Sequence, residues 1–90
     1  MVSKNYNRRQ AQAIIFVAQT KELEIDVKEF GFKDIHRIEG FKLRLMDLEE
    51  KQRRLDISGL HEDFLQKLEW NACRRFLQDL RKQLLLIKKP

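Results

Sequence analysis

The stretch DIHRIEGFKLRLMDLEEKQRRL, residues 34–55, has the clearest periodicity in this chain. At about 100° of rotation per residue, its large apolar side chains fall in one narrow stripe, which predicts an amphipathic helix. The stripe consists of Ile38, Phe41, Leu45, Leu48 and Leu55. Asp34 is placed to cap the start of this helix. Gly40 lies inside it, at a cost of about 1 kcal/mol relative to alanine, and either allows a neighbour to approach closely or marks a bend.

A second long helix is predicted after a short connection. The connection is DISGLHED, residues 56–63, which is rich in turn residues. Ser58 is the candidate N-cap, and Glu62 and Asp63 suit the positive end of the helix that follows. This helix is expected from about residue 59 or 60 to near residue 87. Its apolar set is Phe64, Leu65, Leu68, Ala72, Cys73, Phe76, Leu77, Leu80, Leu84 and Ile87. Because the connection is short, the two long helices are expected to form an antiparallel hairpin.

The N-terminal third allows two interpretations. In NRRQAQAIIFVAQTKEL, residues 7–23, a helix would have to bury Ile14–Val17 on all sides. The alternative is a strand at Ala13–Ala18, followed by a turn and a second strand at residues 23–27, where apolar and polar residues alternate. We favour the helix. The pair Asp26 and Glu29 then resembles a capping box that opens a separate one-turn helix, which Gly31 ends.

Composition supports one all-α domain over residues 1–90, with an N-terminal helical segment followed by the long antiparallel hairpin. Apolar residues make up 42% and charged residues 37%, with only three Gly and one Pro among 90 residues. So few chain breakers favour long regular elements. Cys73 is the only cysteine, the apolar runs are too short to span a bilayer, and no secretory signal is recognisable. We therefore expect a cytoplasmic protein that makes no use of a membrane.

The predicted last helix carries a basic ribbon. Residues 74–90 hold six basic side chains and one acid, in a chain of net charge +5. On a helical wheel the cations form two rows with a seven-residue spacing, namely Lys67, Arg74, Arg81 and Lys88, and beside them Arg75, Lys82 and Lys89. The ribbon would be roughly 33 Å long, comparable to one turn of DNA. It predicts either non-specific phosphate contact or a solvated face, with its charge partly neutralised by acids of the neighbouring helix. Those acids are Glu39, Asp47, Glu49 and Glu50.

Four apolar residues are candidates for a protein interface. Leu43 and Met46 lie off the main stripe of residues 34–55, beside polar residues. Two such side chains must be covered either by the N-terminal segment or by another subunit, and we expect self-association. Trp70 lies near the edge of the apolar arc of the last helix, with Leu77 two turns on. It is either a rim residue of the core or an aromatic anchor for a partner.

The sequence offers no chemistry. No phosphate-binding loop, zinc spacing or converging set of catalytic groups is present, so we expect no enzyme activity, no cofactor and no metal. Cys73 follows the same alternatives as Trp70: a buried core residue, or a thiol whose pKa is lowered by Arg74. The favoured function is a non-enzymatic helical interaction module that acts by helix packing, as a homodimer or as an adaptor to another protein. The alternative is a nucleic-acid-binding accessory protein that uses the basic ribbon.

Overall fold

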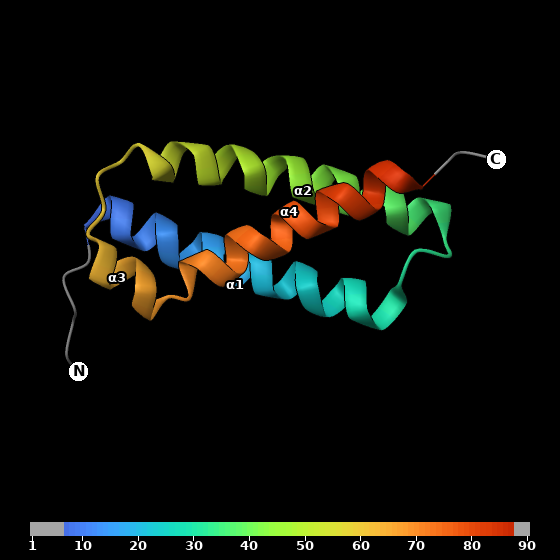
Figure 1. Ribbon diagram of the computed structural model, residues 1–90, viewed down its shortest axis with the longest axis horizontal. Helices are drawn as coiled ribbons and strands as arrows, with labels where there is room; N and C mark the ends of the chain where they lie inside the picture. The colour runs from blue at the N-terminus through green and yellow to red at the C-terminus, as the bar shows by residue number, and fades with distance from the viewer. Residues whose placement is uncertain (1–6, 88–90) are drawn as a thin grey trace.

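The computed structural model describes residues 7–87, which form four helices and no strand (Figure 1). These are α1 (Arg8–Phe30), α2 (Ile35–Asp56), α3 (Glu62–Lys67) and α4 (Trp70–Leu86). Helices α1, α2 and α4 lie alongside one another and alternate in direction, while α3 is a short piece that leads into α4 (Figure 1). The predicted all-α fold, with a helical N-terminal segment and a helical hairpin, is confirmed. Within residues 7–87, no helix combines the length and the apolarity that a membrane span requires.

The N-terminal third folds as one uninterrupted helix, so the strand interpretation of residues 13–27 is wrong. The Asn7 side chain accepts a hydrogen bond from the Gln10 backbone N–H at 2.8 Å, and the Gln10 side chain accepts one from the Asn7 N–H at 3.0 Å. This capping box starts α1. The separate one-turn helix expected at Asp26 is also wrong, because Asp26 lies within α1. Gly31 does end α1, with a φ of 65° that glycine adopts without steric cost.

The apolar run at Ile14–Val17 is not buried on all sides, as the helix interpretation required. Phe16 is fully buried and Val17 nearly so, but Ile15 is 52% exposed. Thr20, one turn after Phe16, is also buried, and its hydroxyl donates a hydrogen bond to the Phe16 carbonyl at 2.8 Å. Because α1 packs against only two other long helices, its remaining face stays in solvent, and Ile15 lies on that face.

Helix α2 matches its prediction closely. Asp34 caps it, since the Asp34 carboxylate accepts a hydrogen bond from the His36 N–H at 2.9 Å. All five residues of the predicted stripe are 6% exposed or less. Gly40 lies inside the helix, and a Cβ added to it would meet no other atom within 4 Å. The glycine therefore does not serve a close approach between helices, which was one of its two predicted roles.

Two ion pairs fix the register of the antiparallel pair α2 and α4. A guanidinium nitrogen of Arg81 lies 2.8 Å from Glu49, and one of Arg74 lies 3.8 Å from Asp56. In both pairs the residue numbers add up to 130, so a residue of α4 lies at the level of the α2 residue that completes this sum. Helix α1 closes the bundle against both partners. Its Phe16 ring lies 4.9 Å, centroid to centroid, from the Trp70 ring of α4.

The second helix of the hairpin is broken, which the sequence analysis did not predict. Helix α3 ends at Lys67, and α4 begins at Trp70, after Glu69 adopts a left-handed conformation with a φ of 61°. In one unbroken helix, Phe64 and Leu68 would lie about 140–180° around the axis from the core residue Leu77. The break redirects the chain, so that both side chains pack half-buried against the core.

The connection between α2 and α3 also differs from its prediction at the cap. His61, rather than Ser58, caps α3, because its Nδ1 accepts a hydrogen bond from the Asp63 N–H at 3.1 Å. Ser58 instead closes the end of α2, where its hydroxyl donates to the Leu55 carbonyl at 2.7 Å. Glu62 and Asp63 occupy the first turn of α3, as predicted from the positive end of the helix dipole.

Candidate interaction surface

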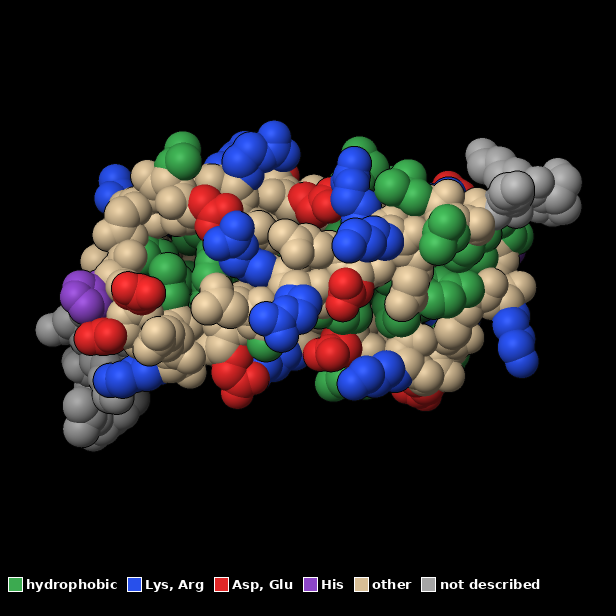
Figure 2. Space-filling view, in the orientation of Figure 1, with side chains coloured by type: hydrophobic (Ala, Val, Ile, Leu, Met, Phe, Trp, Pro, Cys, Tyr) green, Lys and Arg blue, Asp and Glu red, His purple; other side chains and the backbone are tan. Residues whose placement is uncertain are grey.

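An open groove between α2 and α4 has an apolar floor and apolar edges. It is lined by Leu45 and Met46 of α2 and by Leu84, Leu85 and Ile87 at the end of α4. Leu45 and Leu84 are buried, whereas Met46 is 64% exposed and Leu85 is 74% exposed. Figure 2 shows hydrophobic side chains gathered over the C-terminal end of α4. We refer to these five residues as the α2–α4 groove.

The cations at the rim of the α2–α4 groove already have acidic partners. The Lys42 ammonium lies 3.4 Å from a carboxylate oxygen of Glu39, and the Arg81 guanidinium lies 2.8 Å from Glu49. A ligand that bound by charge alone would have to displace these partners. The features of the groove that lack a partner in this structure are therefore its exposed apolar side chains.

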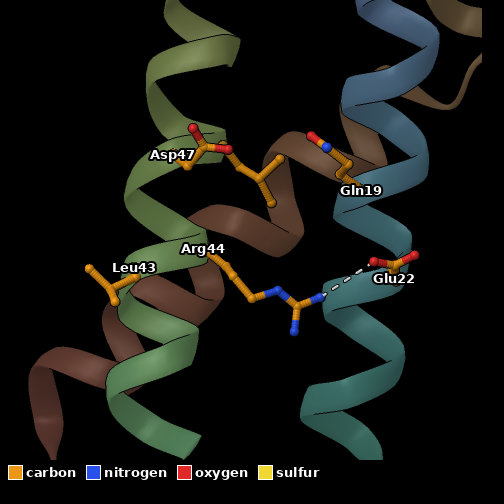
Figure 3. Close-up of a pocket in the computed structure, with 6 residues that line it drawn as sticks. Gln19, Glu22, Leu43, Arg44 and Asp47 are labelled. Atoms are coloured by element: carbon orange, nitrogen blue, oxygen red, sulfur yellow. Dashed lines mark ion pairs between the residues drawn. The ribbon is translucent and has the colours of Figure 1, made fainter.

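Helix α1 does not cover Leu43 or Met46, which was one of the two predicted explanations for their position. Leu43 is 69% exposed and points away from α1 (Figure 3). Its neighbour Arg44 reaches across to α1 instead, where its guanidinium lies 2.8 Å from Asp26 and 3.9 Å from Glu22. The hollow drawn in Figure 3 is thus bridged by paired charges. Within residues 7–87, Leu43 and Met46 remain open to solvent.

The other two predicted interface residues are in the core. Trp70 is 4% exposed and stacks on Phe16, and Leu77 is 1% exposed. Neither side chain is accessible to a partner in this fold. Sequence analysis gave no role to Leu85, which the groove exposes. Its position one turn after Arg81, which faces α2, is the signal that would have found it.

The predicted basic ribbon divides into two parts. The break before α4 places Lys67 on α3, outside the helix that carries the other cations. Arg74 and Arg81 are neutralised by Asp56 and Glu49 of α2, as the solvated-face interpretation required. The exposed cations with no acid within 4 Å in the described part of the chain are Lys67, Arg75 and Lys82. Lys88 and Lys89 lie outside the described residues.

Cys73 is a core residue with an unreactive thiol. It is 4% exposed, and burial raises the pKa of its thiol above the ordinary value; the charge of Lys21 lowers this pKa, while Glu24 and Glu69 raise it further. The alternative of a lowered pKa is therefore wrong. His36 and His61 lie beyond opposite ends of most of α2, and residues 7–87 contain no cluster of three potential metal ligands.

Comparisons of the chain with protein-family models, with curated proteins and with solved structures found no match in any of the three. The case for a function therefore depends on the surface of the molecule.

Proposed function

We propose that this chain is a helical interaction module, which acts by packing the outer side of α2 and the end of α4 against another protein surface. One observation carries the proposal: the α2–α4 groove, with Met46 and Leu85 exposed on either side of a buried apolar floor. Leu43 extends the apolar surface along α2. The proposal assigns the module no reaction and no cofactor, and it places the protein in the cytoplasm.

Apolar surface of this kind is stabilised by burial. Single exposed apolar residues are ordinary on soluble proteins, whereas a contiguous apolar surface is typical of a binding site. Removing apolar surface from water contributes about 25 cal/mol per Å². Met46 and Leu85 would each contribute on this scale when a partner covers the groove. Methionine also adapts its shape to the surface that it meets.

A second candidate is nucleic-acid binding through the unpaired cations Lys67, Arg75 and Lys82. Their support is that they are exposed and have no acidic neighbour within 4 Å in the part of the chain that is described. Arg74 and Arg81, which carried half of the sequence argument, already bind carboxylates of α2. We rank this candidate second for that reason.

Photocrosslinking in the native cell tests the proposal. A photoreactive phenylalanine analogue is introduced in place of Met46 or Leu85, and in a control in place of Ala18, an exposed residue of α1. We expect a protein adduct from the first two positions and not from the third. Adducts with a second copy and adducts with another protein both support the proposed function. Equal yields at all three positions, or no adduct at all, contradict it.

A further inference from the structure

We propose that the partner of this surface is a second copy of the chain, a proposal that rests on the proposed function. The two α2 helices pack antiparallel along their exposed faces, and a two-fold axis passes between the two Met46 side chains. What points to this arrangement is the order of residues on the exposed face of α2.

That face carries seven residues with the three- and four-residue spacing typical of a helix–helix contact. At about 100° per residue, they fall within an arc of roughly 80° on the side of α2 away from the core. None of them is buried. We call them the Met46 stripe: Ile35, Glu39, Lys42, Met46, Glu50, Arg53 and Ile57. From end to end the stripe measures roughly 33 Å at 1.5 Å per residue, so it follows the whole length of α2.

The Met46 stripe is complementary to itself when one copy is reversed. Four residues from Met46 on either side lie Lys42 and Glu50, which have opposite charges. Seven residues away lie Glu39 and Arg53, again of opposite charge. Eleven residues away, both ends carry isoleucine. A two-fold axis at Met46 would bring each residue against its counterpart in the second copy, as a self-complementary two-fold interface requires.

Other arrangements do not use this order. A parallel pair of α2 helices would place Glu39 against Glu39 and Lys42 against Lys42, which is unfavourable. A purely solvated face would account for the charges, because Glu39 pairs with Lys42 at 3.4 Å and Glu50 with Arg53 at 2.8 Å within the chain. It would not account for the apolar residues. These are spaced evenly among the charges on the same stripe and are 46% exposed at Ile35, 64% at Met46 and 84% at Ile57.

The α2–α4 groove lies beside the proposed axis. The register of α2 and α4 places Leu85 at the level of Leu45, one residue from Met46. In an antiparallel pair of helices, the two-fold axis is perpendicular to the plane of the two helix axes, so both α4 helices lie on the same side of that plane. Leu85 and Met46 of the two copies would then surround the axis. The stripe would thus have an apolar centre, two charged zones and an apolar contact at each end.

Sedimentation of the purified chain and of charge-reversal variants tests the pairing. We expect the mass of two chains at micromolar concentration and low salt. Glu39→Arg alone and Arg53→Glu alone should each weaken the dimer about tenfold, because each converts two exposed pairs of opposite charge into like-charge pairs. The double variant E39R/R53E restores opposite charges at both places and should recover the dimer to within about threefold of the original affinity.

Two matched controls lie off the stripe, on the exposed side of α4. Asp79→Arg makes the same charge change as E39R, and Arg75→Glu makes the same change as R53E. Both controls should leave the dissociation constant unchanged. A one-chain mass up to about 100 µM, or a double variant as weak as the single variants combined, would overturn the pairing, since complexes of micromolar affinity would be populated at that concentration. Far-UV circular dichroism of each variant confirms that the helices remain folded.

A disulfide tests the position of the axis separately. Met46→Cys, in a chain whose buried Cys73 is replaced by Ala, should oxidise readily to a two-chain species, whereas Ala18→Cys in the same background should not. Equal rates for the two variants would contradict a contact at Met46. If sedimentation shows a single chain while the photocrosslinks capture a different protein, the self-pairing is wrong and the interaction module stands. If no position gives a specific adduct, the proposed function itself fails.

Discussion

Two matched double reversals on α4 separate the cations that stabilise the bundle from those that are free. R74E/R81E removes the pairs with Asp56 and Glu49, at 3.8 and 2.8 Å, and places acid against acid. The Arg side chains are 41% and 57% exposed, so each pair contributes only about 0.2–1 kcal/mol in solvent. With the added repulsion, we expect the free energy of unfolding to fall by about 1–2 kcal/mol. That corresponds to a decrease in Tm of about 5–15 °C for a domain of this size.

The control R75E/K82E changes the net charge by the same amount on the same helix. Because neither cation has an acid within 4 Å in the described region, its unfolding free energy should change by about 0.5 kcal/mol or less. Thermal and urea unfolding followed by circular dichroism measure both variants, and retention on duplex DNA at low salt is measured in parallel. Loss of retention in R75E/K82E alone would favour the nucleic-acid candidate. Equal destabilisation by the two variants would refute the assignment of ion pairs.

Other substitutions test single features of the fold. Gly40→Ala should raise the free energy of unfolding by about 1 kcal/mol in thermal unfolding, because the added Cβ meets no atom within 4 Å. Trp70→Ala should lower it by about 3–5 kcal/mol by removing the contact with Phe16. Glu69→Gly should not lower it, since relief of the left-handed conformation offsets the lost pair with Lys21. The native Cys73 thiol should react with a thiol reagent far more slowly than in urea, and the stability that its raised pKa contributes should be lost as the pH rises through that pKa.

The fold was predictable wherever one periodicity continued without interruption. The stripe from Ile38 to Leu55 and the Asp34 cap follow from local spacing and hydrogen bonding, and the structure contains both. The break at Glu69 was missed because Phe64 and Leu68 were counted as one face with Leu77. Their angular separation in a straight helix was the available signal. Glycine is the usual residue in a left-handed conformation, so a glutamate there gave no warning.

The candidate surface was predictable in part. Leu43 and Met46 were recognisable from the wheel of one helix, because they lie off its core stripe. Trp70 could not be assigned to core or surface from its own helix, since its burial depends on Phe16 of α1, more than fifty residues earlier in the chain. The division of the cations likewise depends on which acids of α2 lie at their level. Pairings between helices require the register, which periodicity within one helix does not contain.

The charges of the Met46 stripe indicate what kind of dimer it would form. Glu39 and Glu50 already have basic partners within their own helix, so pairing would exchange one partner for another instead of satisfying free charges. Such an exchange contributes little affinity, while a wrong register would set like charges against each other and be excluded. The binding free energy would then come mainly from Met46, Leu85 and the isoleucines at the ends. We therefore expect a reversible dimer of moderate affinity whose alignment depends on charge, and the double variant E39R/R53E measures that alignment directly.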